Sequence, residues 1–169
     1  MTTDPVDDAI AQWRRERPDL EDLDAMALFG RLARLTALAS AAIEAGLAPF
    51  GLKVGEFDVL ASLRRAGDPF ELTPTALGRQ LLLSSGAMTN RLDRLETAGL
   101  VRRRPDPHDR RGVMVGLTDR GRELVDAAVV AHLANEVRLL SALGDRDRAA
   151  FDRAVRTLVA SLAEPGPDA

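Results

Sequence analysis

Five arginines lie within ten residues, from Arg102 to Arg111, in a chain whose formal net charge at pH 7 is -3. The same stretch holds Pro105 and Pro107, which indicate an exposed turn between two extended segments. Guanidinium groups bind phosphate oxygens, and at the tip of a turn they suit the narrow minor groove of DNA. This spacing therefore predicts contact with a polyanion.

The positive charge is confined to the middle of the chain. Residues 1–72 carry a net charge of -5, residues 73–122 one of +5, and residues 123–169 one of -3. A basic segment between acidic flanks is typical of a nucleic-acid-binding module on a soluble scaffold. The alternative is a solvated hairpin with ordinary surface charge.

The residues before the arginines have the pattern of a helix-turn-helix. Thr73 followed by Pro74 is a strong helix start, and Ser84 caps a second helix that Gly99 ends. Two strands, LVRRR and GVMVGLT, then flank the loop PDPHDRRG. This order predicts a winged helix, in which the second helix enters the major groove and the hairpin reaches the backbone or the minor groove.

The outward side of the second helix supplies candidate DNA contacts. With Met88, Leu92 and Leu95 on the core face, small and polar side chains near the helix start point away from the core, where base edges are read. The predicted DNA-binding residues are Ser84, Ser85, Gly86, Thr89, Asn90 and Arg94 on the helix and Asp109, Arg110 and Arg111 on the hairpin. We expect Asp109 to hold a neighbouring arginine extended.

Long helices flank this segment on both sides. The helix expected from about Leu23 to Ala48 is apolar most of the way round, so it must be buried on more than one side, which suggests a partner subunit. We expect a mainly α protein with a small β-hairpin wing. Its parts are N-terminal helices over residues 1–50, a winged helix-turn-helix over 51–118, and C-terminal helices with a tail over 119–169.

Other classes of protein are not indicated. The sequence has no Gly-rich phosphate loop and no nucleophile elbow, so we expect no enzyme. His108 and His132 are far apart and there is no cysteine, so we expect no metal and no cofactor, and we interpret His132 as a helix-packing residue. The longest uncharged run of the second helix is nine residues, which predicts no membrane span. These features fit the cytoplasm.

The segment from Leu72 to Leu124 resembles the winged-helix core of the MarR family of bacterial transcriptional regulators. In the wing, DPHDRRGVMVGLT matches the family signature, with its Asp and Arg at Asp109 and Arg111. The resemblance implies a homodimer built from the N- and C-terminal helices. It also implies binding to a pseudo-palindromic double-stranded DNA operator, with release by a small ligand. We expect a repressor, with an activator as the alternative.

The added first helix, VDDAIAQWRRERPDL, resembles the extension of the family's urate-responsive branch. This resemblance implies a ligand site formed by Trp13, Asp58, Arg91 and Arg103. On a helical wheel Arg91 lies about 60° from Met88, at the edge of the buried face, so its side chain can turn towards Asp58. An arginine and a stacking Trp suit a planar anion such as urate or a related purine.

Several alternatives to this ligand site remain open. Trp13 can be a hydrophobic anchor, and Asp58 can simply pair with Arg91 or Arg103 to hold the domain together. The anion can be another one, such as a tricarboxylate. The fold can also belong to an interaction adaptor that does not bind DNA; its binding would not weaken steeply with salt.

Overall fold

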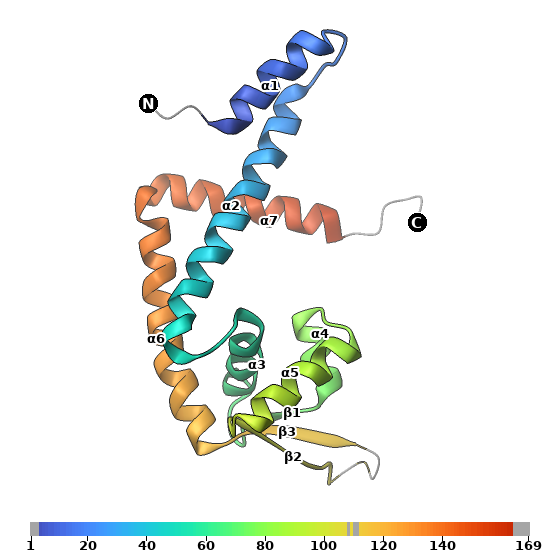
Figure 1. The fold of residues 1–169 in the computed structure, drawn as a ribbon, viewed down its shortest axis with the longest axis vertical. Helices are drawn as coiled ribbons and strands as arrows, with labels where there is room; N and C mark the ends of the chain where they lie inside the picture. Colours follow the sequence, from blue (N-terminus) through green and yellow to red (C-terminus); the bar gives the residue numbers. More distant parts are fainter. Residues whose placement is uncertain (1–3, 108, 110–111, 164–169) are drawn as a thin grey trace.

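The computed structural model describes residues 4–107, 109 and 112–163, and it is mainly helical with one small sheet (Figure 1). The helices are α1 (Pro5–Glu16), α2 (Leu23–Leu47), α3 (Val54–Arg65), α4 (Pro74–Leu81), α5 (Ser85–Thr97), α6 (Asp119–Leu139) and α7 (Asp145–Ala163). The strands are β1 (Glu71–Leu72), β2 (Val101–Pro105) and β3 (Val113–Leu117), and the 3-10 turns are η1 (Ala48–Phe50) and η2 (Leu140–Ala142). The fold class predicted from the sequence is confirmed.

The long helices α2 and α6 pack against each other and carry the other elements. Towards one end of this pair, α3 packs on α6, and α4, α5 and the sheet complete the winged helix (Figure 1). At the other end α1 folds back along α2, so α1 and the wing lie at opposite ends of the molecule (Figure 1).

The predicted helix starts and ends are confirmed around the helix-turn-helix. The Thr73 side chain accepts a hydrogen bond from the Ala76 N–H at 3.1 Å, and the Ser84 side chain accepts one from the Ala87 N–H at 3.4 Å. These bonds satisfy N–H groups that lack partners within their own helices. After α5, Gly99 takes the left-handed conformation with φ +69°, which glycine adopts at little cost.

The sheet has three strands, in the order β1-β3-β2, and both pairings are antiparallel. The hairpin of β2 and β3 was predicted, but β1 was not, because two residues are too few to show an alternating pattern. In the register, Gly116 on β3 stands between Glu71 on β1 and Arg102 on β2. The strand pairing therefore places the acidic Glu71 and the basic Arg102 on either side of Gly116.

The core of the winged helix fixes the position of α5. Its fully buried side chains come from α3, α4, α5, β3 and α6, and they include Leu60, Leu63, Leu77, Met88, Leu92, Leu95, Val115 and Val125. Met88, Leu92 and Leu95 are the three residues predicted for the core face of α5. Close packing of this buried face therefore fixes the orientation of α5 and leaves the side of the helix away from the core exposed.

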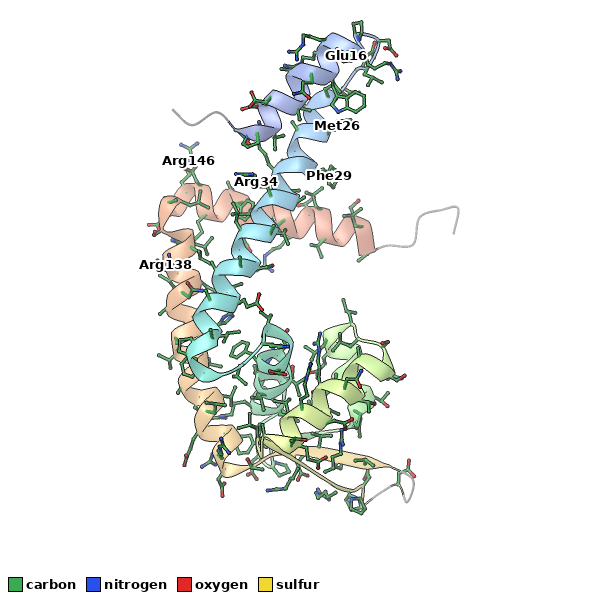
Figure 2. The ribbon with its side chains drawn as sticks, in the orientation of Figure 1. Glu16, Met26, Phe29, Arg34, Arg138 and Arg146 are labelled. Carbon is green, nitrogen blue, oxygen red and sulfur yellow. The ribbon has the colours of Figure 1, made fainter. Side chains whose placement is uncertain are left out.

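Large apolar side chains also lie exposed along the helices outside the winged helix. Figure 2 shows Met26 and Phe29 projecting from α2, and α7 is exposed along its length except at Arg148. Others include Leu35 and Leu38 on α2, Val130, Leu133 and Val137 on α6, and Phe151, Leu158, Val159 and Leu162 on α7. We call this set the apolar helix surface.

The stretch Leu23–Phe50 has a mean hydropathy of 1.4 over an 18-residue window, of which 6% is buried. By length and composition alone it is apolar enough to cross a membrane, which counting uncharged residues did not reveal. A helix buried between protein subunits has the same composition. Its contact with α6 and the apolar side chains of α6 and α7 favour the second reading.

Candidate nucleic-acid interface and ligand site

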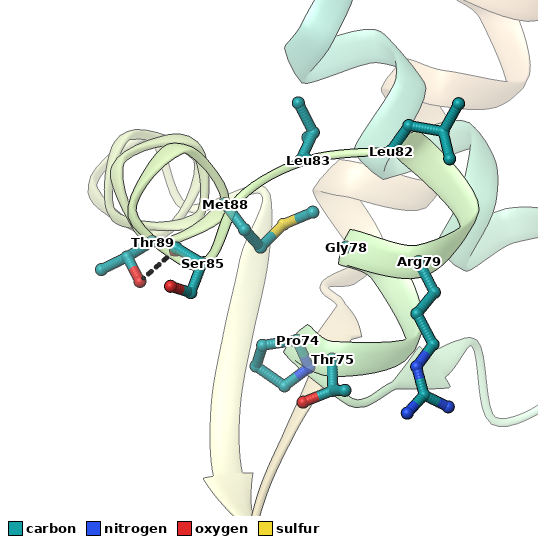
Figure 3. Close-up of a pocket in the computed structure, with 9 residues that line it drawn as sticks. All are labelled: Pro74, Thr75, Gly78, Arg79, Leu82, Leu83, Ser85, Met88 and Thr89. Atoms are coloured by element: carbon teal, nitrogen blue, oxygen red, sulfur yellow. Dashed lines mark hydrogen bonds between the residues drawn. The ribbon is translucent and has the colours of Figure 1, made fainter. Parts of the chain in front are cut away.

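The first half of α5 presents a small, polar, exposed face. Ser84, Ser85, Gly86, Thr89 and Asn90 are all exposed, and the helical wheel places Gly86 and Asn90 on the outward side. The Thr89 hydroxyl donates a hydrogen bond to the Ser85 backbone oxygen at 2.9 Å (Figure 3). Short side chains at the start of a helix allow a close approach to base edges, and the free N–H groups there favour phosphate.

A groove of about 600 Å³ separates α4 from α5 beside this face (Figure 3). It is lined by Pro74, Thr75, Gly78, Arg79, Leu82, Leu83, Ser85, Met88 and Thr89. Two of the predicted DNA contacts, Ser85 and Thr89, therefore stand on its wall. The groove borders the polar face of α5.

Arg94 lies further along α5 and turns back towards α3. Its Nε is 3.1 Å from Oε1 of Glu56, and 55% of its side chain is exposed against 11% for Glu56. The arginine is thus on the surface, but it is paired with a buried carboxylate. Glu56 was not singled out in the sequence.

Two of the wing arginines are bound by Glu71 of β1. Arg104 Nε donates to both Glu71 carboxylate oxygens, at 3.0 and 3.1 Å, and Arg102 Nη2 reaches Oε1 at 3.5 Å. A β-carbon at Gly116 would lie 2.7 Å from Glu71 Cγ, so the glycine gives Glu71 its path across β3. The hydrogen bonds from Arg104 hold the pKa of the Glu71 carboxyl below its usual range.

The tip of the wing is described only in part. Asp109 is exposed, whereas Arg110 and Arg111, with His108, lie outside the described residues. The expected pairing between Asp109 and an adjacent arginine therefore stays a prediction.

Asp58 on α3 and Arg91 on α5 are close enough for the arginine's charge to act on the carboxyl. Nη1 of Arg91 donates to the Gly55 backbone oxygen at 3.4 Å, so this side chain turns from α5 towards α3, as its wheel position predicted. Burial raises the pKa of the half-buried Asp58 carboxyl, and electrostatic interactions, chiefly with the positive charge of Arg91, oppose that rise. An anion that brings a hydrogen-bonding partner to Asp58 and a negative charge to Arg91 would fit this pair.

The other two predicted ligand residues lie elsewhere in the chain. Arg103 pairs with α5 through Asp93 at 2.6 Å and Glu96 at 2.9 Å. Trp13 is on α1, at the opposite end of α2 from α3 (Figure 1). It is 43% exposed and lines a shallow groove with side chains of α2. One chain therefore brings together Asp58 and Arg91, but neither Arg103 nor Trp13 with them.

His132 is a partly buried residue of α6 that packs against α3, in keeping with its interpretation as a helix-packing residue. Its ring centroid is 4.6 Å from that of Phe57, and its Nε2 is 3.2 Å from Glu136. Within the described part of the chain, no group of three or more His, Cys, Asp or Glu side chains could hold a metal ion.

Comparison with known proteins agrees with this geometry. Residues 50–112 match the family model described as MarR family. The chain is 40% identical over 143 residues to the HTH-type transcriptional regulator PecS of Dickeya dadantii, an alignment covering 85% of this chain and 86% of PecS.

Two solved structures are similar over most of their length. AbsC, a MarR family transcriptional regulator from Streptomyces coelicolor, has a TM-score of 0.75 and 26% identity, covering 85% of this chain and 96% of AbsC. A mutant MarR from E. coli in complex with operator DNA has a TM-score of 0.71 and 27% identity, covering 82% of this chain and 99% of that one. The chain therefore belongs to the MarR family of DNA-binding transcriptional regulators, which are not enzymes.

Proposed function

We propose that the protein is a cytoplasmic, homodimeric repressor that binds a pseudo-palindromic operator and releases it when a small planar anion, urate or a related purine, binds. The observation that carries this proposal is the placement of α5. One side of α5 is exposed and polar, and its edge carries Arg91, which turns to the Gly55 backbone oxygen of α3 and whose charge lowers the pKa of the half-buried Asp58. DNA and ligand would thus act on the same helix.

DNA contacts are assigned to the exposed face of α5 and to the wing. Ser84, Ser85, Gly86, Thr89 and Asn90 read the major groove, with Arg94 on phosphate, and Asp109, Arg110 and Arg111 form the minor-groove contact of the wing. The E. coli MarR structure with operator DNA supports this assignment, because the chains share the fold over 82% of this one.

The helices outside residues 51–118 are assigned to the homodimer. The apolar helix surface supports this, since exposed apolar side chains of this number on α2, α6 and α7 are typical of an obligate subunit interface. A subunit partner also accounts for the hydropathy of α2 without a membrane. A twofold dimer presents two copies of α5, which matches a pseudo-palindrome.

The ligand site is assigned to Asp58 and Arg91, with Trp13 and Arg103. Asp58 and Arg91 form the part of the site that lies within one chain. In this proposal Trp13 joins that part only when two chains form the homodimer. A ligand that draws on Arg91 pulls on α5, so its binding energy differs between DNA-competent and DNA-incompetent states, as release requires.

The test is fluorescence anisotropy on a labelled duplex from the DNA immediately upstream of the coding sequence, at near-physiological salt, with and without urate. Tight binding that weakens with urate is expected. Tight binding that ignores urate but responds to a tricarboxylate would replace the ligand and keep the regulator. Binding to protein partners with little salt dependence, and to no DNA, would favour the interaction adaptor.

A further inference from the structure

Two arginines of α5, Arg91 and Arg94, contact the first turn of α3. Nη1 of Arg91 donates to the Gly55 backbone oxygen, and Nε of Arg94 pairs with Oε1 of Glu56. These contacts join consecutive residues of α3 to residues nearly one turn apart on α5. We call the four residues the α3–α5 clasp.

Glu56 is the fixed member of the clasp. Its second oxygen, Oε2, accepts a hydrogen bond from the backbone N–H of Lys53 at 3.0 Å, which is the capping contact at the start of α3. Its side chain is 11% exposed, so its carboxylate is held by α3 and cannot follow Arg94 outwards. Arg94, 55% exposed, is the member that can move.

Arg94 is also the charged residue among the predicted contacts on α5. It lies four residues after Asn90 and therefore continues the same exposed side of the helix. A guanidinium at this place can reach a phosphate oxygen next to the bases that Asn90 faces. In this structure the guanidinium of Arg94 is already paired with the Glu56 carboxylate.

We propose that Glu56 is a positioning residue that withholds Arg94 from DNA, so that operator binding must exchange this carboxylate for a phosphate. The proposal rests on the proposed function, which supplies the DNA. The exchange is feasible because Arg94 is half exposed, so salt screens the pair in part, and because Glu56 keeps its hydrogen bond from the Lys53 N–H when Arg94 leaves.

The test variant is Glu56→Gln. Glutamine keeps an oxygen for the Lys53 N–H and is itself a capping-box residue, so α3 is expected to start at the same place. With the carboxylate charge gone, Arg94 is free for phosphate. We expect the operator dissociation constant to fall about three- to tenfold, because the variant has no carboxylate pair to break before Arg94 reaches phosphate.

Two further variants make the result specific to the clasp. Arg94→Gln in the Glu56→Gln background is expected to cancel the gain, because the freed cation is missing. Glu123→Gln is the matched charge control: Glu123 is an exposed carboxylate on α6, and the structure records no ion pair for it among the described residues. A gain equal to that of Glu123→Gln, or one that survives Arg94→Gln, overturns the proposal.

A readout on the wild-type protein covers the case in which Glu56→Gln fails to fold. The ¹⁵Nε resonance of Arg94 is expected to shift when operator duplex is added, and a constant resonance overturns the exchange. If the wild-type protein binds no DNA, the proposed function fails separately. Elution from heparin then tests the clasp: Glu56→Gln is expected at higher salt than Glu123→Gln, and co-elution overturns the proposal.

Discussion

The guanidinium of Arg91 occupies the space that a β-carbon at Gly55 would fill. A β-carbon built there would stand 2.3 Å from Arg91 Cζ, which is far inside van der Waals contact. Gly55 is thus the opening through which an α5 side chain reaches the backbone of α3.

Gly55→Ala is therefore expected to displace Arg91 without unfolding the protein. The clash is with the end of a flexible side chain, and alanine within a helix gains about 0.5–1 kcal/mol over glycine. We expect an unchanged or slightly raised melting temperature, together with a weaker response of the DNA complex to urate. Parallel thermal melts and anisotropy titrations measure both, and an undiminished urate response would separate Arg91 from ligand binding.

Trp13→Phe distinguishes a ligand contact from a packing anchor. Phenylalanine keeps an apolar ring against α2 but loses part of the stacking area, and aromatic pairs are worth about 0.5–1.5 kcal/mol beyond burial. We expect ligand affinity to fall about two- to tenfold, while basal DNA affinity stays the same. Should the melting temperature fall and the ligand response remain normal, Trp13 is an anchor.

The Glu71 carboxylate predicts a pH dependence of stability. Its pKa in the folded protein is lowered, chiefly by hydrogen bonds from Arg104, so its contribution is present above the unfolded-state pKa and is lost as pH falls through the folded-state value. The free energy of unfolding should therefore decrease below about pH 4.5.

Glu71→Gln should remove that part of the acid dependence and cost about 2 kcal/mol at pH 7, since two charge-assisted pairs are weakened. Urea unfolding of the wild type and the variant between pH 3 and pH 7 compares them. If the free energies of unfolding of the two proteins change with pH in parallel, the Glu71 carboxylate does not contribute to the acid dependence of stability.

Arg111→Ala tests the wing. Loss of one charge-assisted contact should weaken operator binding about tenfold to a hundredfold, with the dimer intact. Arg15→Ala, which removes an exposed arginine on α1, is the control for net charge. Equal affinity of the two variants would remove the wing from operator recognition.

Leu38→Glu tests the apolar helix surface. Leu38 is 60% exposed in the chain, so the change leaves the protomer folded but places a charge in the expected subunit interface. Light scattering after size exclusion should show a monomer, whereas Gln80→Glu on the exposed side of α4 should remain a dimer. A dimeric Leu38→Glu variant would place the interface elsewhere.

The local features of the helix-turn-helix could be predicted from the sequence, because caps act over three or four residues. Thr73 and Ser84 mark helix starts because their side chains can cap a helix, and Gly99 marks a helix end because glycine adopts the left-handed conformation. The ion pairs of the winged helix could not be predicted from the sequence. Arg104 and Glu71 are 33 residues apart, and they meet only because β3 inserts between their strands with a glycine in register.

The ligand residues show the same division. The wheel position of Arg91 indicated the direction of its side chain, since that depends on helix geometry alone. The partners of Arg103 depend on how β2 docks against α5, and the place of Trp13 depends on where α1 lies along α2. Neither docking leaves a periodic signal in the sequence.

The exposure of α7 has a consequence for how the protein folds. A 19-residue helix with few contacts to its own chain is marginal in water, so its helicity depends on what covers its apolar side. If a second copy covers it, folding of α7 and association are one thermodynamic event. The melting temperature should then rise with protein concentration, and dilution alone would unravel the last helix before the winged helix melts.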